Sequence, residues 1–415
     1  MKNLRIKLFS LLFLAGLLTG GKESGPDDAR TEKYFPCIYY EFNAIDPITE
    51  FGLNSFFLRL DQYLSKRQGK INIVHIGDSH IQADYLTHSA RKRFQYTFGN
   101  GGRGFIFPHR LAKVNNAYTV GISGLGVWTN HKSITMSDQG LYGITGISLK
   151  TTDSSAMIYM NPNKLHDMNY EFTRMKLFYE QSENCFGLDF MVNAPGDIDY
   201  DEIPISNGIS QVYFDQPIDS IWMMLDKSGE FQQQFQLYGM SLENDYPGII
   251  YHGIGLNGAY AKSYLRNHYL EPQLKALNAD LVILSLGTND GFMSEGKFCM
   301  QCFKDNYRAL LSRIRSASPK ASILITTPGD NFMRAKIHNT NMKKITEALY
   351  EIAVEYDAAL WDFNKVMGGE HSMRKWHSYG LAQKDLVHFT EEGYNQIGCL
   401  LFEAIMNSYE CRFDR

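Results

Sequence analysis

Three short motifs, far apart in the sequence, hold residue types that together can cleave an ester. They are Gly77-Asp78-Ser79-His80, Gly287-Thr288-Asn289-Asp290 and Asp385-Leu386-Val387-His388. A serine hydroxyl becomes a nucleophile when an adjacent histidine removes its proton, and a carboxylate orients that histidine. We therefore predict Ser79 as the nucleophile, His388 as the base and Asp385 as the residue that fixes the tautomer of His388.

The first two motifs each follow an apolar run that reads as a buried strand. Ile71–Ile76 precedes Ser79, and Leu281–Leu286 precedes Asn289. In an open α/β sheet, ligands bind beyond the carboxyl ends of the strands, so both motifs fall where chemistry is expected. Each residue also has a structural alternative, since Ser79 or Asp290 could cap a helix and Asn289 could stabilise a turn. The occurrence of all the motifs in one chain favours the catalytic interpretation.

These motifs resemble those of the SGNH (GDSL-type) hydrolases. By this resemblance Ser79 is the nucleophile, Asn289 supplies a side-chain donor to the oxyanion, and Asp385 with His388 completes a triad. The sequence departs from the family's Gly-Asp-Ser-Leu because His80 stands in place of the leucine, which leaves the nucleophile unchanged.

The resemblance also implies a glycine whose N–H binds the oxyanion. The run His252–Ala259 contains Gly253, Gly255 and Gly258. A backbone donor requires close approach of the substrate, which glycine allows. We predict that Gly258 has this role, together with the N–H of Ser79 and the side chain of Asn289, and keep Gly255 as the alternative. This chemistry requires no cofactor and no metal.

The elements around the motifs alternate between strand-like runs and helical periodicity. This pattern predicts a three-layer α/β/α parallel sheet, which the resemblance makes SGNH-type and flavodoxin-like. Helices are expected at about 49–66, 82–98, 260–276, 302–316, 340–356 and 391–406. Further strands are expected at Ser322–Thr326 and Ala359–Phe363.

The long stretch between Ser79 and Gly258 has a different character. Short β-like runs such as Met157–Met160, Met175–Tyr179 and Ser220–Leu225 are separated by turn-rich segments, as in a β-sandwich. We predict an inserted β-rich, carbohydrate-binding-like domain at 115–245, between hydrolase segments 34–114 and 246–415. Both crossing points should lie near the active-site end of the sheet, so that the insert overhangs the site. The segment Gly99–Gly104 is expected to be a flexible linker or a substrate-contacting loop.

The N-terminus has the pattern of an export signal. Lys2, Arg5 and Lys7 precede a short apolar run, which predicts a signal peptide at 1–21 and a polar tether at 22–33. Gly21 stands where a lipoprotein box would need cysteine. We therefore expect an exported protein, periplasmic or at the surface of a bacterium, without a transmembrane span in the mature chain.

Charge and cysteine content limit the remaining possibilities. The net charge of −4 argues against nucleic acid as a partner. The basic cluster Arg91-Lys92-Arg93 is expected on a solvated helix face. Cys299 and Cys302 have the spacing of a redox or metal site, but a zinc site needs more ligands, so a local disulfide or two thiols is expected.

The exported SGNH enzymes that this arrangement most resembles are peptidoglycan O-acetylesterases, which carry a β-module between the Ser and Gly motifs. The resemblance implies a serine esterase that removes O-acetyl groups from a glycan, with peptidoglycan as the first choice. An O-acetyltransferase and a xylan acetylesterase are the alternatives within this chemistry. A non-catalytic glycan-binding protein on an SGNH scaffold is the alternative from another class.

Overall fold

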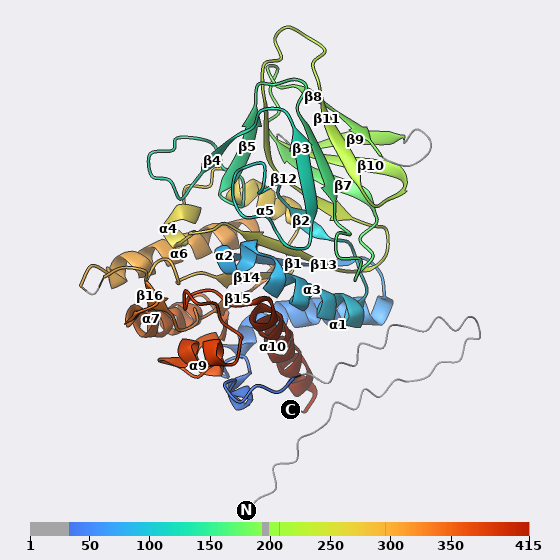
Figure 1. Cartoon of the computed structure of the whole chain (residues 1–415). Coiled ribbons are helices and arrows are strands. Elements are labelled where there is room, and N and C mark those ends of the chain that lie inside the picture. Colours follow the sequence, from blue (N-terminus) through green and yellow to red (C-terminus); the bar gives the residue numbers. More distant parts are fainter. Residues whose placement is uncertain (1–32, 193–198, 207, 295, 415) are drawn as a thin grey trace, which may run out of the picture. The chain divides into compact units, whose positions relative to one another are not determined.

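The computed structural model describes residues 33–414 apart from 193–198, 207 and 295. The predicted signal peptide (1–21) and nearly all of the predicted tether (22–33) lie outside these residues. Cys37–Arg415 forms one compact unit, to which both the parallel sheet and the antiparallel sheets belong (Figure 1). No helix in the part that is described combines the length and apolarity needed to span a membrane.

A parallel sheet forms the centre of the α/β part, as predicted. Its strand order is β13-β1-β14-β15-β18, and every neighbouring pair is parallel. The strands are β1 Lys70–Gly77, β13 Gly248–Gly255, β14 Leu281–Ser285, β15 Ser322–Thr326 and β18 Ala359–Trp361. Because β13, β1 and β14 are adjacent, the residues that follow them meet at one edge of the sheet.

Helices flank this sheet on both sides (Figure 1). They are α1 Asn54–Lys66, α2 Ser79–Gln82, α3 Tyr85–Phe98, α4 Ala261–Tyr264, α5 Leu270–Leu277, α6 Met300–Ala317, α7 Asn341–Glu355, α8 Phe363–Met367, α9 Ser372–Ser378 and α10 Glu391–Glu410. Most expected helices match to within a few residues. The continuous helix expected at 260–276 is wrong, because the chain breaks between α4 and α5, where the Asn267 side chain donates to Ile144 O (3.2 Å).

The β-rich region is made of two antiparallel sheets, as the sequence predicted. One has the order β4-β5-β12-β7-β10-β9 with β2 beside β12, and the other has the order β3-β6-β11-β8. The strands are β2 Gly104–Ile106, β3 Gly121–Leu125, β4 Thr129–Lys132, β5 Ile147–Thr151, β6 Met157–Asn161, β7 Phe172–Tyr179, β8 Gly187–Met191, β9 Tyr200–Ser206, β10 Ile209–Ile218, β11 Ile221–Asp226 and β12 Phe235–Glu243. The short hairpin β16 Phe332–Met333 and β17 Ile337–His338 lies outside both. The predicted limits of a separate domain at 115–245 stay a prediction.

The expectation for the two crossing points is half right. The first is near the active-site end, since Asn115 O accepts a hydrogen bond from Gln82 Nε2 (2.6 Å), just after Ser79. The second lies at the opposite end of the sheet. There Lys70, the first residue of β1, donates from Nζ to Asn244 O (2.8 Å). The chain therefore re-enters the sheet at the N-terminal end of β13, away from the site.

A buried ion cluster connects the Ser79 segment to the β-rich region, and it corrects two expectations. Asp84, in a left-handed conformation (φ 63°), pairs with Arg91 Nη2 (2.8 Å) and with Arg103. Arg91 is fully buried, so its predicted place on a solvated face is wrong. The segment Gly99–Gly104 is neither a flexible linker nor a substrate loop. It packs on β13, where Gly101 N donates to Ile249 O (3.0 Å).

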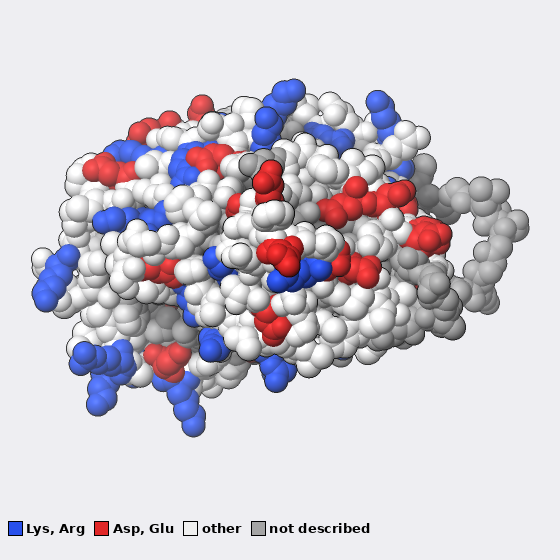
Figure 2. Space-filling model, turned by 90° about the horizontal axis from the view of Figure 1, so that it is seen from above, with Lys and Arg blue, Asp and Glu red and all other residues white. Residues whose placement is uncertain are grey.

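Charged side chains on the face of the molecule shown in Figure 2 are mixed in sign. Lys and Arg lie among Asp and Glu there, with uncharged residues between them. This face therefore carries no continuous field of one sign, in keeping with the net charge of −4.

Candidate active site

The three predicted triad residues lie within hydrogen-bonding distance of one another. Ser79 Oγ is 3.0 Å from His388 Nε2, and His388 Nδ1 is 2.7 Å from Asp385 Oδ2. Ser79 follows β1, whereas Asp385 and His388 lie on the loop before α10. Asp385 Oδ1 also accepts from the backbone N–H groups of Val387 and His388, each at 3.0 Å. One carboxylate thus shapes the loop and orients the imidazole.

The charge state of Asp385 suits this arrangement. Burial by itself would raise the pKa of the carboxyl, but hydrogen bonds from the His388 ring and from two backbone N–H groups offset it and lower the pKa. An ionised Asp385 accepts a hydrogen bond from His388 Nδ1–H. In this tautomer Nε2 of His388 carries no proton and can accept one from the Ser79 hydroxyl. This is the tautomer that removes a proton from serine.

Local packing explains why Ser79 sits at the end of β1. Gly77 has no room for a side chain, since a Cβ there would lie 2.9 Å from Ser285 O. Asp78 then caps α2 by accepting from His80 N (3.0 Å), and Ser79 is the first residue of that helix. The alternative that Ser79 itself is the cap is therefore wrong, and its hydroxyl is directed to His388 instead.

The geometry favours Gly258 over Gly255 as an oxyanion donor. Gly258 is exposed, has φ +77° and has no hydrogen-bond acceptor for its N–H among the described residues. Gly255 is a buried residue of β13, and a Cβ there would lie 2.7 Å from Asp78 O. Close packing thus explains why position 255 is a glycine. The N–H of Ser79 likewise has no acceptor in the part of the chain that is described.

Asn289 lies between the segments that carry Ser79 and Gly258. Its Nδ2 donates to Asp78 Oδ2 (3.1 Å) and to Ala259 O (2.9 Å). Both acceptors are neighbours of the predicted oxyanion donors, so Asn289 ties the ends of β1 and β13 together. An oxyanion at this place would share one of these amide hydrogens.

Three acidic or basic residues to which the sequence assigned no part in the site lie beside it in the structure. Asp78 receives hydrogen bonds from Asn289 and from His80, whose Nδ1 lies 2.8 Å from Asp78 Oδ1. Asp290 accepts from Ala261 N (3.1 Å), the first residue of α4, and burial raises its pKa to about 7. Asp78 and His80 were visible only as members of the first motif, because their partners are distant in the sequence.

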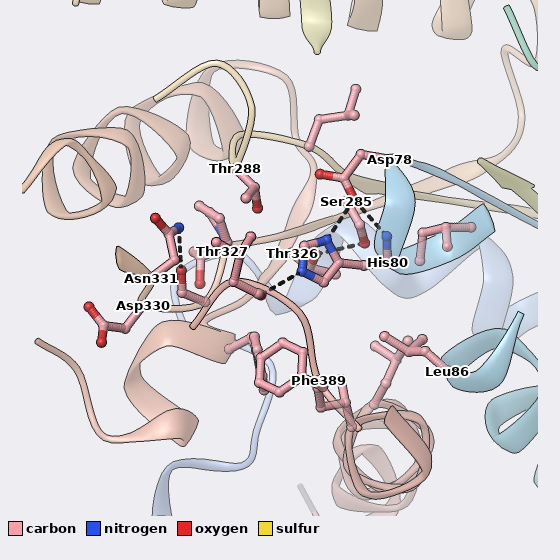
Figure 3. A pocket seen from close by; sticks show the side chains of 18 of the residues that line it. Asp78, His80, Leu86, Ser285, Thr288, Thr326, Thr327, Asp330, Asn331 and Phe389 are labelled. Carbon is pink, nitrogen blue, oxygen red and sulfur yellow. Dashed lines mark hydrogen bonds and ion pairs between the residues drawn. The ribbon is translucent and has the colours of Figure 1, made fainter. Parts of the chain in front are cut away.

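A pocket next to the site is lined in part by Val387 and Phe389, which belong to the loop that carries Asp385 and His388 (Figure 3). It has a volume of about 50 Å³, and its lining includes Asp78 and His80 but not Ser79. Figure 3 shows Asp78, Ser285 and Thr326 on one side and Phe389 and Leu86 on the other. The polar side rests on His75, whose Nε2 lies 2.6 Å from Ser285 Oγ. Burial lowers the pKa of His75 to about 3, so this histidine is neutral.

The residues considered for a metal form a covalent pair instead. Cys299 and Cys302 form a disulfide at the start of α6, which is one of the two arrangements that the sequence left open. Among the described residues, no cluster of three or more His, Cys, Asp or Glu side chains could hold a metal ion.

Comparison with known proteins relates this geometry to one fold. The chain matches the solved structure of a peptidoglycan O-acetylesterase with a TM-score of 0.71 and 23% identity, over 86% of this chain and 96% of that one. A lipase/acylhydrolase from Enterococcus faecalis matches over 39% of this chain and 77% of its own, at 19% identity and a TM-score of 0.32. An acetyl xylan esterase from Geobacillus stearothermophilus matches over 39% and 73%, at 20% identity and a TM-score of 0.28. The search of curated proteins gave no match.

A family model gives the sequence-level counterpart. Residues 228–396 match the GDSL-like Lipase/Acylhydrolase family. This span contains Gly258, Asn289, Asp385 and His388, whereas Ser79 precedes the β-rich region and lies outside it. The chain therefore shares the fold of a peptidoglycan O-acetylesterase, and its residues 228–396 are similar to the GDSL-like acylhydrolases.

Proposed function

We propose that the chain is a serine esterase that removes O-acetyl groups from a glycan, and that this glycan is peptidoglycan. The observation that carries the proposal is the hydrogen-bonded series from Ser79 Oγ to His388 (3.0 Å) and from His388 to Asp385 (2.7 Å). A hydroxyl, a base and an orienting carboxylate in this order are the groups that acyl transfer through a serine ester requires.

In the proposed reaction, Ser79 Oγ attacks the acetyl carbonyl carbon while His388 Nε2 takes its proton. The carbonyl π electrons move to oxygen, and this oxyanion accepts hydrogen bonds from Ser79 N–H, Gly258 N–H and Asn289 Nδ2. The intermediate then expels the sugar oxygen, which receives the proton from His388. Water then attacks the acetyl-serine while His388 takes its proton, and the second tetrahedral intermediate releases acetate as Ser79 Oγ leaves and regains this proton from His388.

Two features support a glycan as the substrate. The fold shared over 86% of the chain is that of a protein described as a peptidoglycan O-acetylesterase, β-rich region included. In addition, the loop between β4 and β5 reaches the site. If Gly258 carried a Cβ, that atom would lie 3.7 Å from Ile134 Cδ1. Arg266, just after α4, anchors this loop by donating to Thr135 O (2.8 Å). A polymer that enters the site would thus also contact the β-rich region.

The proposed substrate also requires export. Peptidoglycan lies outside the cytoplasmic membrane, and the basic and apolar N-terminal segments at 1–21 have the composition of a signal peptide. We therefore propose a location in the periplasm or at the cell surface of a bacterium.

Acetate release by the purified mature protein tests the proposal. The substrates are O-acetylated peptidoglycan and acetylated xylan, with Ser79→Ala as the control. We expect release from peptidoglycan that Ser79→Ala abolishes. Release from xylan alone would keep the mechanism and change the substrate. Transfer of acetyl to a second sugar in place of release would indicate a transferase.

A fluorophosphonate probe, which labels only an activated serine, separates enzyme from binding protein. Labelling of wild type but not of Ser79→Ala is the expected result. Glycan binding without any labelling would contradict the esterase proposal. Full acetate release by Ser79→Ala would show that the nucleophile has been assigned wrongly.

A further inference from the structure

His80 lies between the two segments that carry the catalytic groups. Its Nδ1 is 2.8 Å from Asp78 Oδ1, and its Nε2 is 3.2 Å from Val387 O. Its ring stacks on that of His388, with centroids 5.3 Å apart. The residue is thus next to Ser79 in the sequence and next to His388 in space.

We propose that His80 is a positioning residue: as a doubly protonated imidazolium, it bridges the Asp78 carboxylate and the Val387 carbonyl and so holds His388 against Ser79. The inference rests on the proposed function, because the position that it explains is that of His388 as the base.

The contacts themselves determine the charge of this ring. A carbonyl oxygen can only accept a hydrogen bond, and so can an ionised carboxylate. Both oxygens of Asp78 already act as acceptors, because Oδ1 accepts from the His80 backbone N–H and Oδ2 accepts from Asn289 Nδ2. A neutral imidazole has one N–H and can satisfy only one of its two acceptors. Both bonds together require the imidazolium.

The electrostatic surroundings agree with this charge. Burial alone would lower the pKa of His80, but the charge and hydrogen bond of Asp78, the Val387 carbonyl and the charge of Asp385 together outweigh burial and raise the pKa above its ordinary value of 6.5. Other titratable groups surround the ring. They are Asp385 and His388 on the triad loop, Tyr394 on α10, whose ring centroid lies 5.9 Å from that of His80, and His75 and Asp330 across the pocket. Of these neighbours, His75 is held neutral.

The triad loop needs such a restraint. Leu386 has φ +55°, a left-handed conformation that costs about 1–2 kcal/mol for a residue with a side chain. Leu386 O accepts from Phe332 N (2.9 Å) and His388 O accepts from Gln383 N (2.8 Å), but Phe332 lies in the hairpin β16–β17 and Gln383 on the loop itself, so neither bond reaches the Ser79 segment. The bond from His80 to Val387 O joins the loop to the helix that begins with Ser79. It therefore sets the distance between nucleophile and base.

The test measures the pH dependence of serine reactivity. We would record the rate of fluorophosphonate labelling against pH for wild type, His80→Gln and His80→Leu, with His377→Gln as the matched control. His377 bonds Ala382 O (2.9 Å) and does not contact the triad. Wild type should lose reactivity on the alkaline side, where His80 gives up a proton and one of its bonds. His80→Gln should lack this alkaline limb and react up to about 100-fold more slowly at its maximum.

The second readout is the protonation state of the ring, followed by ¹⁵N NMR and assigned by the signal that His80→Gln removes. We expect both ring nitrogens of His80 to carry protons at pH 7. The ring should lose one proton at the same pH at which the labelling rate of wild type falls on the alkaline side. His80→Leu, which recreates Gly-Asp-Ser-Leu, should be at least as slow as His80→Gln.

A neutral His80 at pH 7 would overturn the inference, as would an alkaline limb that persists in His80→Gln. If His80→Leu does not fold, the other variant and the NMR titration still decide. Failure of the proposed function itself would differ, since Ser79 of the wild type would then not be labelled at any pH.

Discussion

Asp290 places a buried carboxyl group next to the site and makes stability depend on pH. Its folded-state pKa of about 7 lies above the ordinary value of 3.8 because the side chain is buried. The folded chain therefore binds this proton more tightly than the unfolded chain does. Stability from this group is complete below about pH 3.8, falls as the pH rises to about 7, and then stays constant.

We predict that Asp290→Asn removes this pH dependence. The amide keeps an oxygen for Ala261 N–H and does not ionise. The difference in unfolding free energy between the variant and wild type should therefore be more favourable to the variant at pH 8 than at pH 5, by up to about 2.7 kcal/mol. Urea titrations at the two pH values measure this difference, in which constant effects of the substitution cancel. Asp305→Asn, at an exposed position on α6, is the control and should show no such change. Equal differences for both variants would contradict the prediction.

Single residues could be chosen as site candidates where one motif contains its own chemistry. Ser79, Asn289, Asp385 and His388 could be selected because each residue type has one role in ester cleavage. The role of His80 could not be predicted, since its partner Val387 is 307 positions away. The same is true of Arg91, whose burial depends on Asp84 and on the path of the segment that contains Arg103. A charged side chain gives no sequence signal of its partner.

At the scale of elements, the loop between β4 and β5 is where the β-rich region meets the site. Asp138 fixes its shape by accepting from Lys132 N and Gly140 N, each at 2.8 Å. The side chain of Met136 on this loop is 61% exposed, and its Sδ lies 3.7 Å from Tyr260 Oη. The loop thus presents apolar side chains to a substrate that extends beyond the ester.

We predict that Ile134→Ala separates polymeric from small substrates. A glycan that touches the loop should lose contact area, so KM for O-acetylated peptidoglycan should rise several-fold, by about 1 kcal/mol of binding. Turnover of p-nitrophenyl acetate, which reaches only the triad, should not change. Val127→Ala, at an exposed apolar position of the β-rich region, is the control and should leave both unchanged. An equal loss on both substrates would show that the loop shapes the triad instead of binding glycan.

Elements were predictable where periodicity is long and unbroken. The apolar residues of α3, α6, α7 and α10 recur with helical periodicity over several turns. The expected ends of these helices lie within a few residues of the observed ones. The break between α4 and α5 was missed because the polar residues there are buried by the β-rich region, as with Asn267 against Ile144. That neighbour is distant in sequence, so local periodicity could not indicate it.

At the scale of the molecule, the parallel sheet and the β-rich region share one hydrophobic core. A single cluster of buried residues runs from Val74 in β1 through Phe105 in β2 to Phe178 in β7. A hydrogen bond from backbone to side chain reinforces this contact, since Phe105 N donates to His252 Nδ1 (3.1 Å) in β13. The sequence indicated two regions of different character, but pairings such as β2 with β12 depend on strands far apart in the chain. It therefore could not show that they are packed as one.

We predict that Cys37–Arg415 unfolds in one cooperative step. Removing the β-rich region from the sheet would expose the shared core, so neither region should persist without the other. The four tryptophans allow a direct test, because Trp128 and Trp222 lie in the β-rich region while Trp361 and Trp376 lie in the α/β part. Two variants, each retaining one pair and carrying phenylalanine in place of the other, report on the two regions separately.

Their urea transitions followed by fluorescence should coincide with each other and with the transition of the wild type by circular dichroism, once each is corrected for the stability of its variant. The calorimetric and van't Hoff enthalpies of the wild type should agree as well. A β-rich region that unfolds at a lower urea concentration than the α/β part would mean that the contact through Phe105 and His252 is weak. The insert would then be an independent domain, as its composition alone suggests, and its contacts with the site could be removed without loss of the triad.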